Sequence, residues 1–303
     1  MKKAIIAVDA GGTKTKVCVI NAKKEVVYEK SGGPGSPAVL KEAAFHNIFE
    51  LVEEVYSQVR DQYQISFIQM GVSGLGTVAN VSEYEKAIAD KIGIETSIES
   101  DAILGLYSIV EDKFKEGVLV LSGTGSACAG INNDDTMLLG GFGQLLTETG
   151  SSYASVKMLV TKTILRYEDS LTYIPLGKKF MDLINANSII DFKVFMYNHT
   201  KGEIAKYAKF ISNEALNGDL EAQAILKKSG QDLAYYVVRL HHHLKLTNKA
   251  VLGFRGSFIQ NAPFVKEELL KTLELENISL NLVGGDGDPI YGAYYLAKKK
   301  GKL

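Results

Sequence analysis

Two glycine-rich turns lie far apart in the sequence, and the residues of both could bind an anion. They are Asp9-Ala10-Gly11-Gly12-Thr13-Lys14-Thr15 and Ser122-Gly123-Thr124-Gly125-Ser126. Glycine and threonine leave backbone N–H groups and a hydroxyl open, because no bulky side chain keeps a phosphate away. One such turn is typical of an ordinary hairpin, whereas two that face each other could hold a polyphosphate from both sides.

An aspartate adds a carboxylate to the first turn. Asp9 directly follows the apolar run from Ala4 to Val8. Mg²⁺ retains several waters and takes one or two carboxylates, so Asp9 is a candidate for holding hydrated Mg²⁺ beside bound phosphates. The alternative is an aspartate that only stabilises the turn.

A second aspartate, Asp101, follows the strand-like segment from Glu95 to Glu99 and stands where a helix is expected to begin. A carboxylate within hydrogen-bond reach of a substrate hydroxyl can accept its proton as a general base. The alternative is a helix N-cap, a position that aspartate often takes. Both interpretations can hold, since a cap would also fix the side chain.

The elements that must position these residues follow from the apolar pattern of the first half. Phe45, Ile48, Val52 and Val55 recur at helical spacing, with glutamates on the opposite face. Short β-branched runs bounded by glycine or serine indicate buried strands. We expect strands at 4–8, 16–20, 26–29, 66–72 and 95–99 and helices at about 45–59, 82–91 and 102–110.

The second half repeats this pattern around its own glycine turn, which indicates a duplicated α/β unit. Apolar runs at 118–121 and 127–131 flank that turn, and a mostly helical stretch from Gly150 to about Leu246 interrupts the second copy. Strands at 250–253 and 279–283 and a helix at 263–273 follow. A last helix begins with Asp288 as N-cap and Pro289 in its first turn.

Composition excludes several classes of function. A formal net charge of −1 gives no electrostatic reason to expect nucleic acid or an acidic membrane as partner. Cys18 and Cys128 are too few for a disulfide framework or a cysteine-rich metal site, and both lie in apolar runs that predict buried thiols. Neither a signal peptide nor a bilayer-spanning run is recognisable, so we expect a cytoplasmic protein.

In this order, the two turns and Asp101 resemble the actin-like sugar kinase and Hsp70 superfamily. The chain is most similar to the family that N-acetylglucosamine kinases share with the activator ATPases of benzoyl-CoA reductase and hydroxyacyl-CoA dehydratase. Further matching segments are Gly71-Val72-Ser73-Gly74-Leu75, Gly140-Gly141-Phe142-Gly143, Glu148-Thr149-Gly150-Ser151 and Pro289-Ile290-Tyr291-Gly292-Ala293. Only the combination of these pieces is specific.

The resemblance implies an α/β fold of two ribonuclease-H-like (actin-like ATPase) domains with a cleft between them. The second domain would carry the mostly helical insertion. We expect the N-terminal domain at 1–108 and the C-terminal domain at 109–288. The helix at about 289–303 would pack back on the N-terminal domain, as is typical of the family.

The resemblance also implies a site for ATP and Mg²⁺. Asp9 would hold Mg²⁺ through water, and Asp101 would be the general base. The residues implied for the nucleotide are Gly11, Gly12, Thr13 and Lys14, the second turn at Gly123, Thr124 and Gly125, the adenosine-side pair Gly256 and Ser257, and Ala208 in an adenine slot. Lys14 has a solvated turn lysine as its alternative, and Ala208 has helix packing.

The sugar side is implied by a third set of positions. These are Ser36, Ser73, Gly74, Ser126, Ala127, Gly141, Phe142, Gly143 and Glu148, besides Asp101. Three of them depart from the family pattern, which often has Asn in place of Ser36 and Ala127 and Asp in place of Glu148. Because the departures all lie on the acceptor side, we expect a modified amino sugar, such as N-acetylmuramic acid.

The sequence thus predicts an ATP- and Mg²⁺-dependent kinase that phosphorylates the 6-hydroxyl of N-acetylglucosamine, N-acetylmuramic acid or both. Alternatives are a glucose or glucosamine kinase, an activator ATPase, which needs cysteine thiolates for an iron–sulfur cluster, and a non-enzymatic regulator. The expected partner is a small sugar, with no nucleic acid and no membrane. Family habit further implies a homodimer formed through the helical insertion.

Overall fold

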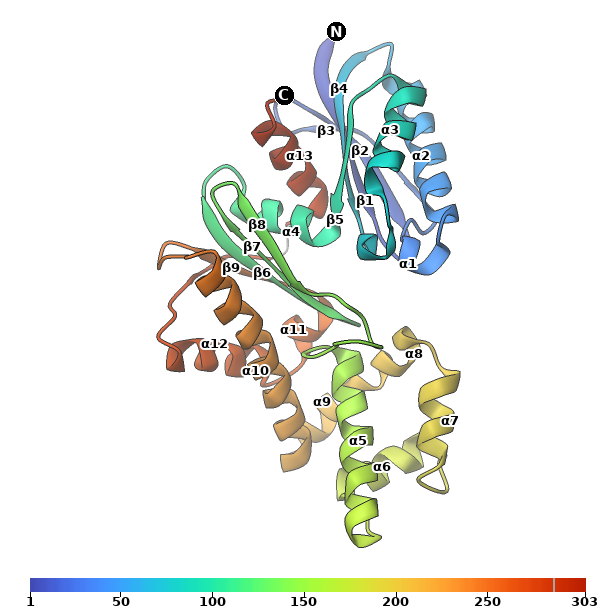
Figure 1. Ribbon diagram of the computed structural model, residues 1–303, viewed down its shortest axis with the longest axis vertical. Coiled ribbons are helices and arrows are strands. Elements are labelled where there is room, and N and C mark those ends of the chain that lie inside the picture. The colour runs from blue at the N-terminus through green and yellow to red at the C-terminus, as the bar shows by residue number, and fades with distance from the viewer. Residues whose placement is uncertain (286) are drawn as a thin grey trace. The chain divides into compact units, whose positions relative to one another are not determined.

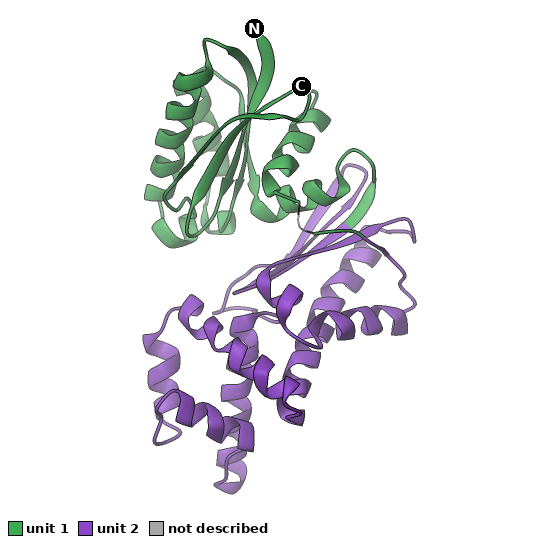
Figure 2. Cartoon of the chain, turned by 180° about the vertical axis from the view of Figure 1, so that it is seen from behind, with its two compact units in different colours: residues 1–117, 283–303 green, residues 118–282 purple. Residues whose placement is uncertain are grey.

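The computed structural model describes residues 1–285 and 287–303 and divides the chain into two compact units (Figure 2). Unit 1 comprises Met1–Gly117 and Val283–Leu303, and unit 2 comprises Val118–Leu282. The units therefore part at residues 117 and 283, whereas the sequence placed the divisions at 108 and 288. Residue 108 lies inside helix α4 (Asp101–Val110), which belongs wholly to unit 1.

Unit 1 is built on a five-stranded sheet with the order β3-β2-β1-β4-β5. Its strands are β1 (Lys2–Ala10), β2 (Thr15–Asn21), β3 (Val26–Gly32), β4 (Tyr63–Val72) and β5 (Thr96–Ser100). The first three strands form an antiparallel meander, and β4 and β5 continue the sheet parallel to β1. The carboxyl ends of β1, β4 and β5 consequently share one edge of the sheet.

Helices cover both faces of this sheet (Figure 1). One face carries α2 (Ala43–Val59) and α3 (Val81–Ile92), and the other carries α4 and α13 (Pro289–Lys299). The short α1 (Pro37–Leu40) and the 3₁₀ turn η1 (Leu75–Thr77) lie in the connections.

The alternation of side chains along β1 determines the face of the sheet to which Asp9 points. Ala4, Ile6, Val8 and Ala10 lie in the core beneath α2. Successive residues of a strand point to opposite faces, so Asp9 points to the face that α4 and α13 cover. The strand thus directs its carboxylate toward the helix that begins with Asp101.

Unit 2 repeats this strand order in a sheet of order β10-β9-β6-β7-β8, which confirms the predicted duplication. Read from β8, the sheet has the order β8-β7-β6-β9-β10, so three consecutive strands again lie beside two strands that come later in the chain. The strands are β6 (Glu116–Ser122), β7 (Ser126–Asn132), β8 (Asp135–Gly140), β9 (Val251–Arg255) and β10 (Asn281–Leu282). The last strand has two residues, fewer than the five predicted.

Helices make up most of unit 2, and the predicted helical stretch is confirmed. They are α5 (Ser152–Ser170), α6 (Pro175–Leu183), α7 (Asp191–Asn198), α8 (Lys201–Lys206), α9 (Ala208–Leu216), α10 (Leu220–His243), α11 (Ser257–Asn261) and α12 (Val265–Leu275). Helix α10 packs on β7 and β8, and one hydrophobic core joins strands and helices. None of the helices described has the length and apolar character needed to span a bilayer.

Both cysteines are buried, as predicted. Burial raises the pKa of the Cys18 thiol to about 11 and raises that of Cys128 further above its ordinary value. A thiol that resists ionisation is a poor metal ligand and a poor nucleophile. Neither residue therefore offers reactive sulfur chemistry.

Side-chain caps fix where the long helices begin. Ser151 accepts the Ala154 N–H at the start of α5, and Asp219 accepts the Ala222 N–H at the start of α10. Asp288 caps α13 by accepting the Ile290 N–H, with Pro289 in the first turn, as predicted. Each cap satisfies an N–H group that the helix cannot pair internally.

A glycine allows α13 to approach α4 closely. A Cβ placed on Gly292 would lie 1.8 Å from the carbonyl oxygen of Leu104, so only glycine fits there. Leu104 belongs to the helix that begins at Asp101, and its side chain packs over Gly71 of β4. The position of α4, and with it that of Asp101, therefore depends on this contact.

We expect Gly292→Ala to lower the free energy of unfolding by about 1–3 kcal/mol, the usual cost of overpacking a filled interior. Gly76→Ala is the matched control, because no atom lies within 4 Å of a Cβ placed there. That variant should stay within about 0.5 kcal/mol of the parent protein. Urea denaturation measures both, and equal stabilities would contradict the close packing of α13 on α4.

Candidate active site

The first glycine turn, in unit 1, directs its carbonyl groups into the protein. The Ala10 oxygen accepts the Ser73 N–H at 2.9 Å, and the Gly11 oxygen accepts the Gly35 N–H at 3.0 Å. In a trans peptide the N–H points away from the carbonyl of the same plane. The N–H of Gly12 therefore faces away from the Gly35 loop, toward the side where an anion can approach.

Asp9 lies beside this turn, at the last but one position of β1, and its side chain is half-buried. A single carboxylate suits Mg²⁺, which fills its remaining positions with water and phosphate oxygens. The Lys14 oxygen accepts the Gly11 N–H at 2.9 Å, so Gly12 supplies the outward N–H of this segment. Gly12, Thr13 and Lys14 are all exposed at the tip of the turn. The chemistry of this donor set fits the ion that the sequence implied.

Asp101 is the first residue of α4 and not its cap. Ser100 takes the cap position and accepts the Ile103 N–H at 3.3 Å. The N-cap alternative for Asp101 is therefore wrong, because the neighbouring serine performs that task. The Asp101 carboxylate accepts the Ala102 N–H through Oδ1 at 2.9 Å, which orients the group at the carboxyl end of β5.

Ser36, Ser73 and Gly74 come together in unit 1. The Ser36 hydroxyl donates to the Ser73 carbonyl oxygen at 2.7 Å, and Gly74, at φ +75°, packs against Ser36 and Ala38. Ser36 is 2% exposed. Its hydroxyl ties two loops together, and the expectation that it binds a sugar stays a prediction.

The second glycine turn, in unit 2, is held by the beginning of α5. The Gly123 oxygen accepts the Ser152 N–H at 2.9 Å, the Thr124 oxygen accepts the Tyr153 N–H at 3.4 Å, and the Gly125 oxygen accepts the Gly123 N–H at 2.9 Å. The carbonyls of Gly123 and Thr124 thus point toward the beginning of α5, and that of Gly125 closes the turn. The N–H groups of Thr124 and Gly125 point the opposite way, as in the first turn.

Gly256 and Ser257 lie against the second turn. Gly256 has φ +108°, and a Cβ there would lie 2.4 Å from the Ser122 carbonyl oxygen. This close approach brings the Ser257 N–H and hydroxyl to within 4 Å of a Cβ placed on Gly123. The two segments form one polar surface at the ends of β6 and β9.

A cavity of about 450 Å³ opens beside this surface. Its lining comprises Thr124, Ser152, Thr200, Gly202, Glu203, Ala205, Lys206 and Ser257. The lining is rich in hydroxyl groups, and a lysine reaches it from α8. A volume of this size suits part of a small polar ligand, such as a nucleoside phosphate.

Ala208 does not line this cavity. It is 4% exposed and lies in the hydrophobic core of unit 2, so the packing alternative is correct and the adenine-slot interpretation is not supported. Ala205 and Lys206, on the preceding helix, line the cavity instead. Thr200, which caps that helix through a capping box with Glu203, also went unnoticed in the sequence.

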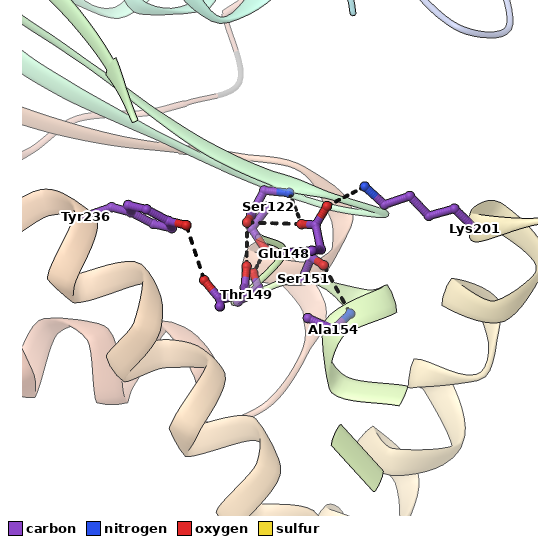
Figure 3. Close-up of polar contacts among 9 residues, drawn as sticks. Ser122, Glu148, Thr149, Ser151, Ala154, Lys201 and Tyr236 are labelled. Carbon is purple, nitrogen blue, oxygen red and sulfur yellow. Dashed lines mark hydrogen bonds and ion pairs between the residues drawn. The ribbon is translucent and has the colours of Figure 1, made fainter. Parts of the chain in front are cut away.

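Glu148 is turned toward the second glycine turn (Figure 3). One of its oxygens accepts the Ser126 N–H at 2.8 Å and the Ser126 hydroxyl at 3.3 Å, and the other forms an ion pair with Lys201 of α8. The Glu148 side chain is only 2% exposed. Its carboxylate therefore contacts Ser126 and Lys201, and the expectation that it binds a sugar stays a prediction.

The remaining sugar-side positions follow β8. Gly141 donates its N–H to the Ser126 oxygen at 3.0 Å, and a Cβ on Gly141 would lie 3.6 Å from that of Ala127. Phe142 is 66% exposed, and Gly143 adopts φ +83°. The structure brings Ser126, Ala127 and Gly141 together, and Phe142 extends from them into solvent.

Lys201 is the residue of this site that sequence reasoning missed. It is 53 residues from Glu148 in the chain and belongs to the helical insertion. No motif singles it out, since a lysine at the first position of a short helix is ordinary on a protein surface. Only the fold of the insertion places its ammonium group at the turn.

Known proteins with the same fold include several sugar kinases. An N-acetylmuramic acid/N-acetylglucosamine kinase from Clostridium acetobutylicum is 26% identical over 313 residues, covering 98% of this chain and 99% of that protein. A candidate N-acetylglucosamine kinase from Chromobacterium violaceum superposes with a TM-score of 0.70 at 18% identity, covering 97% of this chain and 98% of the other.

A third similar protein is a glucokinase of the ROK family from Streptomyces griseus, solved in complex with glucose and AMPPNP. Its TM-score is 0.57 at 15% identity, over 98% of this chain and 99% of that one. These structural likenesses support the actin-like two-unit fold. The sequence model of one family matches residues 6–297, nearly the whole chain, and the protein therefore belongs to the BadF/BadG/BcrA/BcrD ATPase family.

Proposed function

We propose that this protein is an ATP-dependent kinase of amino sugars. The observation that carries the proposal is the position of Asp101 on the sheet edge that also bears Asp9 and the first glycine turn, with Ser100 serving as the cap. A carboxylate that the helix does not need as its cap is suited to act on a substrate. The kinase from Clostridium acetobutylicum, similar over 98% of the chain, supports the same substrate class.

In this proposal each glycine turn binds phosphate through its outward N–H groups, which are those of Gly12 in the first turn and of Thr124 and Gly125 in the second. Peptide dipoles held in place before the ligand arrives stabilise negative charge without reorganising during the reaction. Gly256, Ser257 and the cavity beside them accept the rest of the nucleotide. ATP use is in keeping with the ATPase family and with the AMPPNP bound to the related glucokinase.

The role proposed for Asp101 is to accept the proton of the sugar hydroxyl as that oxygen attacks the γ-phosphorus. The oxygen bound to the β-phosphorus then leaves with ADP. Asp9 would hold Mg²⁺ through water, and the ion would neutralise phosphate charge. The hydrogen bond from the Ala102 N–H keeps the Asp101 carboxylate oriented throughout the transfer.

For the acceptor we propose an N-acetylated hexosamine phosphorylated at its 6-hydroxyl. The side chains of Phe142, Leu145 and Leu146 are largely exposed in the loop that follows β8. Apolar side chains in that loop suit a sugar that carries methyl groups, such as an acetamido or lactyl substituent. The loop thus favours a modified sugar over plain glucose.

The activator ATPases of the same family are the second candidate class, because the family name covers them. They need accessible cysteine thiolates for their cluster. Cys18 and Cys128 are buried, with thiol pKa values raised by desolvation. We therefore favour the kinase, and an assay for iron and sulfide on anaerobically purified protein distinguishes the two.

We expect Asp101→Asn to lower kcat by about 10²–10⁴, the usual contribution of a general base. The amide oxygen can still accept the Ala102 N–H, so the fold and the affinity for ATP should persist. A coupled ADP assay measures kcat, and calorimetry measures nucleotide binding. Asp90→Asn, on the exposed side of α3, is the matched control and should leave kcat unchanged. A near-parental kcat for Asp101→Asn would remove Asp101 from the mechanism.

We expect turnover with N-acetylglucosamine or N-acetylmuramic acid in the presence of ATP and Mg²⁺, and much less with glucosamine or glucose. The same assay with 6-deoxy-N-acetylglucosamine tests the position of transfer, since that sugar lacks the proposed nucleophile. It should bind as an inhibitor without being phosphorylated. Turnover with glucose alone would overturn the substrate class, and phosphorylation of the 6-deoxy sugar would overturn the 6-hydroxyl.

A further inference from the structure

The Glu148–Lys201 pair places a buried negative charge directly behind a turn that is proposed to bind phosphate. Glu148 accepts both the N–H and the hydroxyl of Ser126, so the carboxylate touches the last residue of the turn. Its side chain is 2% exposed, and water therefore screens it little. An unbalanced carboxylate in this position would repel a nucleotide.

Lys201 balances that charge from the helical insertion. Its ammonium group forms an ion pair with the Glu148 oxygen that does not contact Ser126, and its side chain remains 29% exposed (Figure 3). A Cβ placed on Gly125 would lie 2.5 Å from Lys201 Nζ and 3.2 Å from Glu148 Oε2. The glycine thus lets the pair lie against the tip of the turn.

The other contacts of Ser126 show why a carboxylate is present at all. The single hydroxyl proton of Ser126 is shared between Glu148 and the Thr149 carbonyl oxygen, so the segment 148–149 holds Ser126 at its N–H and its side chain. Glu148 fixes the end of the turn by accepting hydrogen bonds. The Glu148 carboxylate brings a negative charge with these hydrogen bonds. Lys201 neutralises that charge, so the turn can still bind a polyanion.

We propose that Lys201 is a positioning residue that sets the affinity of the second turn for nucleotide phosphates by neutralising Glu148. This inference rests on the proposed function only in that the turn binds a nucleoside phosphate. It requires no particular sugar and no transfer step. It also gives the helical insertion a task in nucleotide binding, through the first residue of α8.

A purely structural clamp and a charge-balancing pair predict different outcomes for the two partners. If the pair only clamps the turn, removing either partner breaks the same contact, and both variants lose affinity alike. If Lys201 balances charge, Lys201→Met leaves a buried carboxylate by the phosphates, whereas Glu148→Gln removes the repulsion and retains an acceptor for the Ser126 N–H. The two changes then act in opposite directions.

The experiment measures the dissociation constant of ADP with Mg²⁺ by calorimetry, without sugar, on the full chain. Lys201→Met should weaken ADP binding at least tenfold. Glu148→Gln should leave the affinity unchanged or make it tighter, and the double variant should recover at least threefold relative to Lys201→Met. Lys201→Arg, which keeps the charge, should bind within threefold of the parent.

Lys179→Met is the matched control, because Lys179 pairs with Glu214 at 2.5 Å within the same insertion and away from the turn. It should not change ADP affinity. Thermal unfolding of each variant reports any loss of fold. If Lys201→Met is unstable, the double variant can still be compared with the parent protein, because it leaves no buried charge unpaired. Equal losses for Lys201→Met and Glu148→Gln, or no loss for either, would overturn the inference.

The same measurement separates this inference from the proposed kinase activity. Parent protein that binds ADP but phosphorylates no sugar would overturn the kinase and leave the lysine test intact. Parent protein that binds no ADP would overturn both. Sugar turnover with unchanged ADP affinity in Lys201→Met would overturn only the role of Lys201.

Discussion

The direction of backbone carbonyl groups is the constraint on which each glycine turn depends, the one in unit 1 and the one in unit 2. In unit 1 the oxygens of Ala10 and Gly11 are bound by backbone N–H groups of neighbouring loops, and in unit 2 those of Gly123 and Thr124 are bound by the beginning of α5. Since peptide planes are rigid, binding the oxygens orients the N–H groups. The directions of the Gly12, Thr124 and Gly125 N–H groups are therefore set by neighbouring segments.

Much of this organisation could be predicted because it is local in the sequence. Glycine and threonine mark the turns, apolar alternation marks the strands, and Asp288 with Pro289 marks the start of the last helix. The repeated strand order follows from the same patterns, as do the buried Cys18 and Cys128. Such features depend on residues close together in the chain, and their physical causes act over short distances.

What the sequence could not supply depends on contacts between distant segments. The sequence does not show that Ser36 ties a loop to Ser73, or that Glu148 anchors Ser126. Lys201 carries no local signal. Asp101 was ambiguous until Ser100 proved to be the cap, because both residues are good N-caps and only the backbone angles distinguish them.

The contact between Gly292 and Leu104 has a consequence for biosynthesis. Unit 2 is a continuous stretch of chain, whereas unit 1 needs α13, which leaves the ribosome after all of unit 2. Until then α4 alone covers one face of the nascent N-terminal sheet. Unit 2 can complete its core in the meantime, so the half that bears Asp101 matures last.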